Sequence, residues 1–223
     1  MAVEIEPLFP TDRCDWDEFT RFMLENTFPF HVNPSPTREE IESRKADGGF
    51  APPEHALLAV RVGGGLVGVV GLDDLDGDAP LFDIRLADGM RGRGWGRKTV
   101  RELVRHLFDT YPRITRVEAQ TRDDNIAMRR VLLHNGFVKE AHYRRTWPVA
   151  GGSPRDSVAY GLLRSDFETG RTTPLVWDDL KVRFPGREPH PRLAPILNLS
   201  TPQPSQPALP RFTCLEACSQ DAG

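Results

Sequence analysis

The chain has 223 residues, of which 39% are hydrophobic, and it carries a formal net charge of -3 with an isoelectric point near 6.1. This length and composition suffice for one substantial core, and the slight acidity argues against nucleic acid as a partner. The sequence has neither a long apolar run nor a basic, apolar leader, so we expect no membrane span and no secretory signal, and we predict a cytoplasmic protein.

The N-terminal part predicts two helices that precede the sheet. From Asp15 onward an apolar face recurs at helical spacing, and it consists of Trp16, Phe19, Phe22 and Met23. Thr37 is followed three residues later by Glu40, which has the form of a capping box at the start of the second helix. Phe28 and Phe30 lie between the helices, and we interpret them as core residues rather than as parts of a pocket.

Strands are predicted after these helices, at residues 55–62, 66–72, 81–86, 116–121, 138–143 and 157–164. The first two form a hairpin around three consecutive glycines. In the third, Phe82, Ile84 and Leu86 alternate with Asp83 and Arg85, which is typical of a strand that buries one face. The order of elements predicts an α/β (α+β) fold in which a mixed sheet is flanked by helices.

A glycine-rich loop joins the strand at 81–86 to a strongly amphipathic helix. The loop reads Arg91-Gly92-Arg93-Gly94-Trp95-Gly96-Arg97-Lys98, and the apolar face of the helix runs from Val100 to Phe108. Glycine lets backbone N–H groups approach an anion, and the start of the helix adds unpaired amides and the positive end of its dipole. The loop is therefore predicted to bind a polyphosphate.

Two other phosphate-binding loops do not fit this stretch. The dinucleotide fingerprint needs its third glycine three residues after the second, whereas Gly92, Gly94 and Gly96 are evenly spaced. A Walker loop needs Gly-Lys followed by Ser or Thr, which neither this loop nor residues 63–65 supply. If the loop is considered alone, it could also be interpreted as an ordinary arginine-rich turn.

A second motif follows the strand at 116–121. Asn125 stands where a helix needs an oxygen to cap its first N–H groups, and Gly136 is expected to end that helix in the left-handed conformation, with Phe137 packed behind it. From Arg91 to Arg130 there are eleven Lys or Arg residues and five Asp or Glu residues. Positive charge is therefore concentrated around both motifs.

The two motifs together resemble the GCN5-related N-acetyltransferase (GNAT) family. Arg91, Gly94 and Gly96 match the R/Q-x-x-G-x-G/A pyrophosphate loop, and Asn125 with the later Gly-Phe pair matches the second half of the signature. The resemblance extends from about residue 56 to residue 167 and is closest to the RimJ/RimL-like branch, the ribosomal-protein type. It implies a GNAT fold in residues 1–168, with a mixed, mostly antiparallel twisted sheet flanked by helices.

The resemblance implies acetyl-CoA as the co-substrate. In the family, the strand before the phosphate loop separates from its neighbour, and its free backbone groups bind the pantetheine arm and polarise the thioester carbonyl. The asparagine is implied to donate to pantetheine besides capping its helix. The expected coenzyme-binding residues are Ile84, Arg85, Leu86, Arg91, Gly92, Arg93, Gly94, Trp95, Gly96, Arg97, Asn125 and Arg130, with Lys98 and Arg129 as further candidates for the phosphate rim. The two N-terminal helices are expected to wall the acceptor site.

The catalytic residues are less clearly marked. Many family members carry a tyrosine seven residues after the asparagine to protonate the leaving thiolate, but this chain has Leu132 there, and Met128 replaces the Ser or Ala of the ribosomal-protein type. Glu118 is our first candidate for a base acting through water, and Tyr143 is the other predicted catalytic residue, with His142 beside it. No metal is expected.

The implied reaction is direct transfer of an acetyl group from acetyl-CoA to a primary amine. Only the neutral amine attacks, so an α-amine with a reference pKa of about 7.7 to 8.0 needs less help than a lysine near 10.4, which favours a protein N-terminus. A small-molecule amine such as an antibiotic or a polyamine stays open, as do a domain that binds acyl-CoA without turnover and a purely structural protein. The chain is expected to be a monomer or a homodimer without nucleic-acid or membrane partners.

The C-terminal part is predicted to lie outside the domain. Residues 169–184 are interpreted as a short extension whose apolar anchor is Trp177. Residues 185–223 include eight prolines between Pro185 and Pro210, a composition that predicts a disordered tail.

Overall fold

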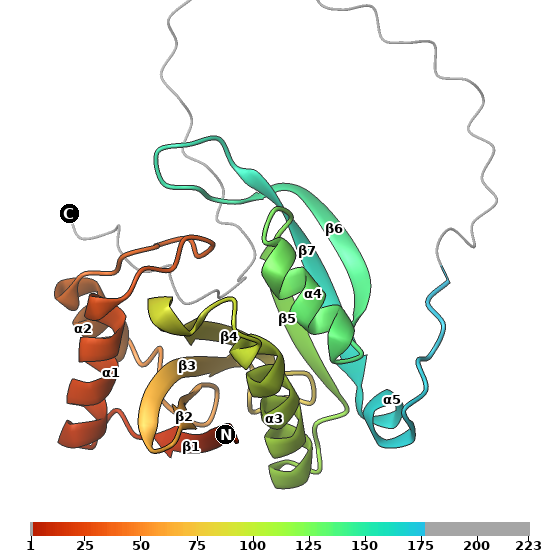
Figure 1. The fold of residues 1–223 in the computed structure, drawn as a ribbon, viewed down its shortest axis with the longest axis horizontal. Helices are drawn as coiled ribbons and strands as arrows, with labels where there is room; N and C mark the ends of the chain where they lie inside the picture. Colours follow the sequence, from red (N-terminus) through yellow and green to blue (C-terminus); the bar gives the residue numbers. More distant parts are fainter. Residues whose placement is uncertain (1, 177–223) are drawn as a thin grey trace, which may run out of the picture. The chain divides into compact units, whose positions relative to one another are not determined.

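The computed structural model describes residues 2–176. Its strands are β1 (Glu4–Leu8), β2 (Ala56–Val62), β3 (Gly65–Asp73), β4 (Leu81–Leu86), β5 (Arg116–Arg122), β6 (Val138–Trp147) and β7 (Arg155–Leu163). They form one sheet in the order β1-β2-β3-β4-β5-β7-β6, in which every neighbouring pair is antiparallel except β4 and β5 (Figure 1). The predicted mixed, mostly antiparallel sheet is confirmed.

The helices are α1 (Arg13–Glu25), α2 (Arg38–Ala46), α3 (Trp95–Thr110), α4 (Ile126–His134) and the short α5 (Arg164–Thr169), with a 3-10 turn, η1, at Asp88–Met90. The capping box predicted for α2 is present, because Thr37 and Glu40 cap each other's backbone amides. Within residues 2–176, no helix is long and apolar enough to cross a membrane. Trp177 and the proline-rich segment lie outside the described residues, so the predicted extension and tail stay predictions.

The expectation that two helices precede every strand of the sheet is wrong, because the first element of the chain is a strand. Strand β1 comes before α1 and pairs with β2, in a register that sets Ile5 opposite Val60. Pro7 lies in this strand at the edge of the sheet, a position where a missing N–H can be tolerated. The alternation of Val3 and Ile5 with glutamates was the signal for this strand, and the proline interrupts it.

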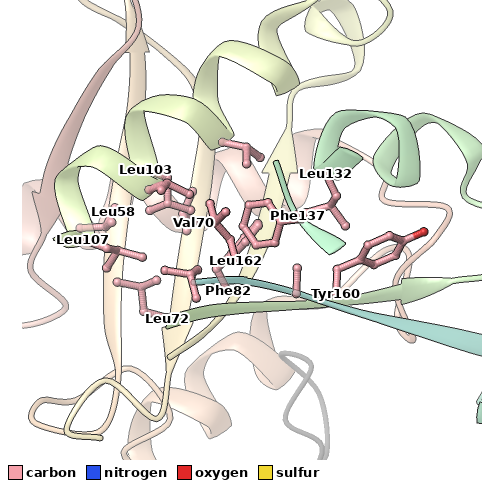
Figure 2. Packing of buried hydrophobic residues seen from close by; sticks show 14 of the residues in the cluster. Leu58, Val70, Leu72, Phe82, Leu103, Leu107, Leu132, Phe137, Tyr160 and Leu162 are labelled. Carbon is pink, nitrogen blue, oxygen red and sulfur yellow. The ribbon is translucent and has the colours of Figure 1, made fainter. Parts of the chain in front are cut away.

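The larger core lies between the sheet and helices α3 and α4. The apolar face of α3 contributes Leu103 and Leu107, which are fully buried and lie close to Leu58 and Leu72 of the sheet (Figure 2). Leu132 of α4 lies beside Phe137 in the same view. Gly136, at φ 85°, ends α4 in the left-handed conformation, as predicted, and lets the chain turn so that Phe137 is buried.

A smaller core lies on the opposite face of the sheet, under α1 and α2. It joins the apolar face predicted for α1 to the alternate residues of β2 and β3, and its members are Leu8, Trp16, Phe19, Phe22, Met23, Phe28, Ile41, Phe50, Leu57, Ala59 and Val69. Because strand side chains alternate between faces, Leu57 and Leu58 belong to different cores. The prediction that Phe28 and Phe30 are core residues is confirmed for Phe28, which is 1% exposed, and is wrong for Phe30, which is only half-buried and belongs to neither core.

Candidate active site

Strands β4 and β5 are joined at one end and separate along their length. Among the described residues their one registered pair is Leu81 with Glu118. Beyond it, residues 82–86 and 119–122 form no ladder with each other, although β4 stays paired with β3 on its other edge. The edge of β4 that faces β5 therefore offers unpaired backbone N–H and C=O groups to a ligand. This is the arrangement that the prediction for residues 84–86 requires.

The glycine-rich loop leads from η1 into the first turn of α3. Gly92 and Gly94 have φ angles of 71° and 81°, which glycine adopts without strain. Gly96 has no positive φ, so its place in the motif does not come from backbone strain. In the part of the chain that the structure describes, the backbone amides of residues 91–97 make no well-formed hydrogen bond. With the N-terminal end of α3, these amides form a region suited to an anion.

The side chain of Arg91 points back toward the sheet rather than outward. Its Nε donates to the Leu86 carbonyl at 3.0 Å, and its Nη2 contacts Asp88 Oδ1 at 2.9 Å. The same guanidinium also donates to the backbone carbonyl of Thr27, in the connection between α1 and α2. Arg91 thus braces the end of β4 against this connection, while its backbone amide stays available in the loop.

The basic residues around the loop divide into two groups. Arg93, Arg97 and Arg130 are exposed, and their contact with a phosphate stays a prediction. Arg129 turns inward, where Nη1 donates to the Asp123 carbonyl at 2.7 Å and Nε donates to the Tyr160 hydroxyl at 3.1 Å. Arg129 therefore differs from the expectation, because its guanidinium links α4 to β7.

Asn125 uses both atoms of its side-chain amide. Its Oδ1 accepts from the Met128 amide at 3.2 Å, which confirms the predicted helix cap. Its Nδ2 donates to Thr121 Oγ1 at 3.0 Å, so one of the two N–H bonds is already used. The contact with pantetheine stays a prediction that depends on the second N–H.

The two predicted catalytic residues are not neighbours in the sheet. Glu118 lies at the point where β4 and β5 separate, and its Oε1 is 3.0 Å from Arg116, which also holds Glu140 at 2.6 Å. Tyr143 lies on β6, which is separated from β4 by β5 and β7, and it is 38% exposed. Glu118 is thus close to the separation, and Tyr143 is three strands away from β4.

A buried charged cluster on β4 was missed by the sequence analysis. Arg85 is 2% exposed, and its Nε donates to Asp83 Oδ2 at 3.0 Å. The other oxygen of Asp83 is 2.7 Å from His31 Nε2. Burial raises the pKa of Asp83, but the charges and hydrogen bonds of His31 and Arg85 outweigh it and hold that pKa well below its ordinary value.

This cluster corrects the expectation that β4 buries only one face. The charged side chains at 83 and 85 lie on the face covered by the connection between α1 and α2, where Arg85 stacks over Phe28 at 4.8 Å. Alternating charges in a strand resemble a solvent-facing pattern, and their partner His31 is 52 residues from Asp83 in the sequence. No local signal could have joined them.

The connection between α1 and α2, residues 26–37, is attached to both separating strands. His31 bonds to Asp83 of β4, and Arg122 of β5 donates to the Pro29 carbonyl at 3.1 Å. Arg122 also lies over the Phe30 ring at 5.2 Å. The connection thus lies against β4 and β5 on the face opposite α3, beside the place where the two strands part.

Residues 4–138 match the model of a family described as the acetyltransferase (GNAT) domain. Among solved structures, a spermidine N-acetyltransferase from Vibrio cholerae in complex with CoA and spermine is 18% identical, with a TM-score of 0.63 over 74% of this chain and 98% of that chain. The same enzyme with manganese ions is 18% identical, with a TM-score of 0.60 over 76% and 96% of the two chains. Its dodecameric structure in an intermediate state is 17% identical, with a TM-score of 0.60 over 74% and 95%.

These likenesses to solved structures show a common fold at low sequence identity. No curated protein matches the chain in sequence.

Proposed function

The chain belongs to the GNAT acetyltransferase family and is an acetyl-CoA-dependent N-acetyltransferase, and on this premise we propose that its acceptor is a primary α-amine, such as the N-terminus of a protein. The finer placement in the RimJ/RimL-like branch belongs to the same proposal. It rests on the motif of Asn125 and the Gly136-Phe137 pair together with the phosphate loop.

The reaction centre of the proposal is the separation of β4 from β5, which lies next to the unbonded amides of residues 91–97 and supports binding of the coenzyme. The amides and exposed Arg93, Arg97 and Arg130 suit the diphosphate and 3′-phosphate of the coenzyme. The free edge of β4 then supplies backbone groups for the pantetheine arm and a donor for the oxygen of the thioester carbonyl. Rate enhancement would come chiefly from holding amine and thioester together and from that donor.

Among the candidate acceptors, an α-amine needs the least from the charged residues of this site. The charged residues near the separation are paired with one another, as in Glu118 with Arg116 and Asp83 with Arg85. Paired charges leave little net field for holding a polycation, whereas an α-amine is partly neutral near pH 7.5 and needs no such field.

A polyamine acceptor is the second candidate, because several similar solved structures are of a spermidine N-acetyltransferase. A domain that binds acyl-CoA without turnover is the third. The chain departs from the commoner family pattern at Leu132, where the usual tyrosine acid is missing.

The test is an acceptor panel with the full chain and acetyl-CoA. Free thiol release would be followed for peptides with different N-terminal residues, for the same peptides with blocked N-termini, and for spermidine and an aminoglycoside. Mass spectrometry would locate the acetyl group. We expect turnover with free but not with blocked N-termini. Faster turnover with spermidine would establish the polyamine candidate, and calorimetric binding of acetyl-CoA without turnover would establish the binding domain.

A further inference from the structure

The ring of His31 is held in one orientation by a carboxylate. Its Nε2 is 2.7 Å from Asp83 Oδ1, and the opposite oxygen of Asp83 accepts from Arg85 Nε at 3.0 Å. Both groups favour the charged form of Asp83, which as a carboxylate can only accept a hydrogen bond. The proton of a neutral His31 ring therefore lies on Nε2, and Nδ1 carries the lone pair.

The Nδ1 atom of His31 is buried, and it has no hydrogen-bond partner among the described residues. A buried polar atom without a partner is uncommon and costs stability, so it calls for an explanation. His55 provides a contrast, since it bonds to Asp73 through Nδ1 at 2.8 Å while its Nε2 faces the largely exposed Glu54 at 4.0 Å. Both rings are anchored by a buried aspartate, but only His31 keeps its second nitrogen buried and unused.

The position of His31 relates it to the reaction. Asp83 is two residues from Leu81, the first residue of β4, where β4 pairs with β5 before the two strands separate, and it directly precedes the residues proposed to bind pantetheine. His31 belongs to residues 26–37, which have neither helix nor strand structure and lie against β4 and β5 beside the place where the two strands part. For His31 to act in the reaction, an amine must reach Nδ1 from the α1 and α2 side of the separation.

We propose that His31 is the general base that removes a proton from the acceptor ammonium, and that Asp83 is the positioning residue that holds its ring. The inference rests on the proposed function. The ammonium gives one proton to Nδ1, the neutral nitrogen forms a C–N bond to the thioester carbon, and the C–S bond breaks. The nitrogen then loses its second proton to the leaving thiolate, and His31 releases the first proton to solvent.

Charged groups around His31 and its connection come from β4, β5 and the phosphate loop. Asp83 and Arg85 face it from β4, while Arg122 of β5 and Arg91 of the loop contact neighbouring residues of the connection. Because the pKa of Asp83 is held well below its ordinary value, Asp83 itself contributes no change of rate with pH near neutrality.

The experiment measures kcat/KM against pH, with an N-terminal peptide as acceptor, for the wild type and for His31→Gln. Glutamine can still donate to Asp83 but cannot take the proton. We expect a loss of about a hundredfold in kcat/KM, and no inflection from the imidazole in the residual rate, with acetyl-CoA affinity unchanged. The matched control is His55→Gln, which breaks the corresponding pair with Asp73 and should keep the wild-type profile. Glu118→Gln tests the competing base.

The outcomes separate the two proposals. If the wild type is active and His31→Gln keeps kcat/KM within about threefold with an unchanged pH profile, the role of His31 is overturned. A loss of about a hundredfold of kcat/KM in Glu118→Gln but not in His31→Gln would overturn it as well. A wild type that acetylates no amine overturns the proposed function, and the catalytic assignment falls with it. If His31→Gln fails to fold, nitrogen-15 NMR of the wild-type ring decides, because a proton on Nδ1 of the neutral ring overturns the inference.

Discussion

Gly68 of β3 lies so close to Arg85 of β4 that a Cβ added at Gly68 would be 2.6 Å from the Arg85 carbonyl oxygen. A contact this short with backbone cannot be relieved by turning a side chain. We therefore expect Gly68→Ala to lower the free energy of unfolding by about 1 to 3 kcal/mol and to weaken acetyl-CoA binding, because it pushes on residues 84–86. Urea unfolding and calorimetry would measure the two effects.

Gly161 is the control for that substitution. A Cβ there would also meet atoms at 2.6 and 2.7 Å, but these are the ends of the Glu140 and Arg116 side chains, which can move. Gly161→Ala should cost less than about 1 kcal/mol and leave coenzyme affinity unchanged. Equal losses in the two variants would contradict the view that the backbone of β4 is what Gly68 makes room for.

Gly94→Ala tests the phosphate loop. Alanine is strained at the φ of 81°, so the loop path should change, and we expect the KM for acetyl-CoA to rise about tenfold or more. Gly151 has a φ of 68° and, like Gly94, nothing within 4 Å of an added Cβ. Gly151→Ala should therefore lose similar stability with an unchanged KM, and a KM that stays constant in both variants would remove the loop from the coenzyme site.

Asn125→Asp separates the helix cap from the coenzyme contact. Aspartate keeps the oxygen that accepts from the Met128 amide, and its charge suits a helix N-terminus, so stability should change by less than about 1 kcal/mol. It removes the N–H groups of Nδ2, so the KM for acetyl-CoA should rise if this side chain also holds pantetheine. Unchanged stability and unchanged KM would leave Asn125 as a cap alone.

The buried residues Asp73 and Asp83 should contribute to the free energy of unfolding with opposite dependence on pH. Burial raises the pKa of Asp73 from its ordinary 3.8 to about 6. The charge of Arg44, 3.7 Å away, and the hydrogen bond to His55 both lower this pKa, but they do not offset burial fully. The folded protein then binds the proton more tightly than the unfolded chain, so the contribution of Asp73 is lost as pH rises from about 4 through 6. Asp83, with its lowered pKa, contributes stability above about pH 4 that is lost as pH falls.

Urea unfolding at pH 4.5 and 7 would check this difference. Relative to the wild type, Asp73→Asn should gain stability on going to pH 7, on the order of 1 to 3 kcal/mol, whereas Asp83→Asn should be most destabilising at pH 7. The same trend in both variants would show that the contrast in their surroundings does not control their titration.

Arg164 holds the C-terminal end of α3. Its guanidinium donates to the carbonyls of Phe108, Tyr111 and Ile114 at 2.9, 2.8 and 2.7 Å. Arg164→Met should cost about 2 to 4 kcal/mol, because it removes a cation at a helix C-terminus and three hydrogen bonds. Arg101, exposed on the same helix, is the control, and Arg101→Met should stay within about 0.5 kcal/mol in the same thermal or urea unfolding assay.

Local sequence signals predicted much of the fold. The glycines between β2 and β3, the periodicity of α3 and the caps at Asn125 and Gly136 each act over a few residues, and each is found where it was predicted. The hairpin strands agree with the prediction to within one residue at each end. Strand β1 was missed, because its partner β2 is about fifty residues away in the sequence and Pro7 interrupts the alternation of apolar and polar residues in β1.

The candidate site was predictable only where it consists of backbone. The loop from Arg91 follows from glycines in a fixed order, which sequence reveals directly. The cluster of His31, Asp83 and Arg85 depends on a long-range contact and on burial of charge, and neither leaves a periodic pattern in the sequence.

The unbonded amides of residues 91–97 have a consequence for how this protein should be mutagenised. Every residue except proline retains its amide, so an alanine scan through the loop would remove the arginine side chains but leave the backbone amides proposed to bind phosphate in place, and it would undercount those amides. Changes of backbone path, such as those at Gly92 and Gly94, are needed to move them. By the same reasoning, sequences that differ widely in this loop can keep one coenzyme, provided that the path of the chain stays the same.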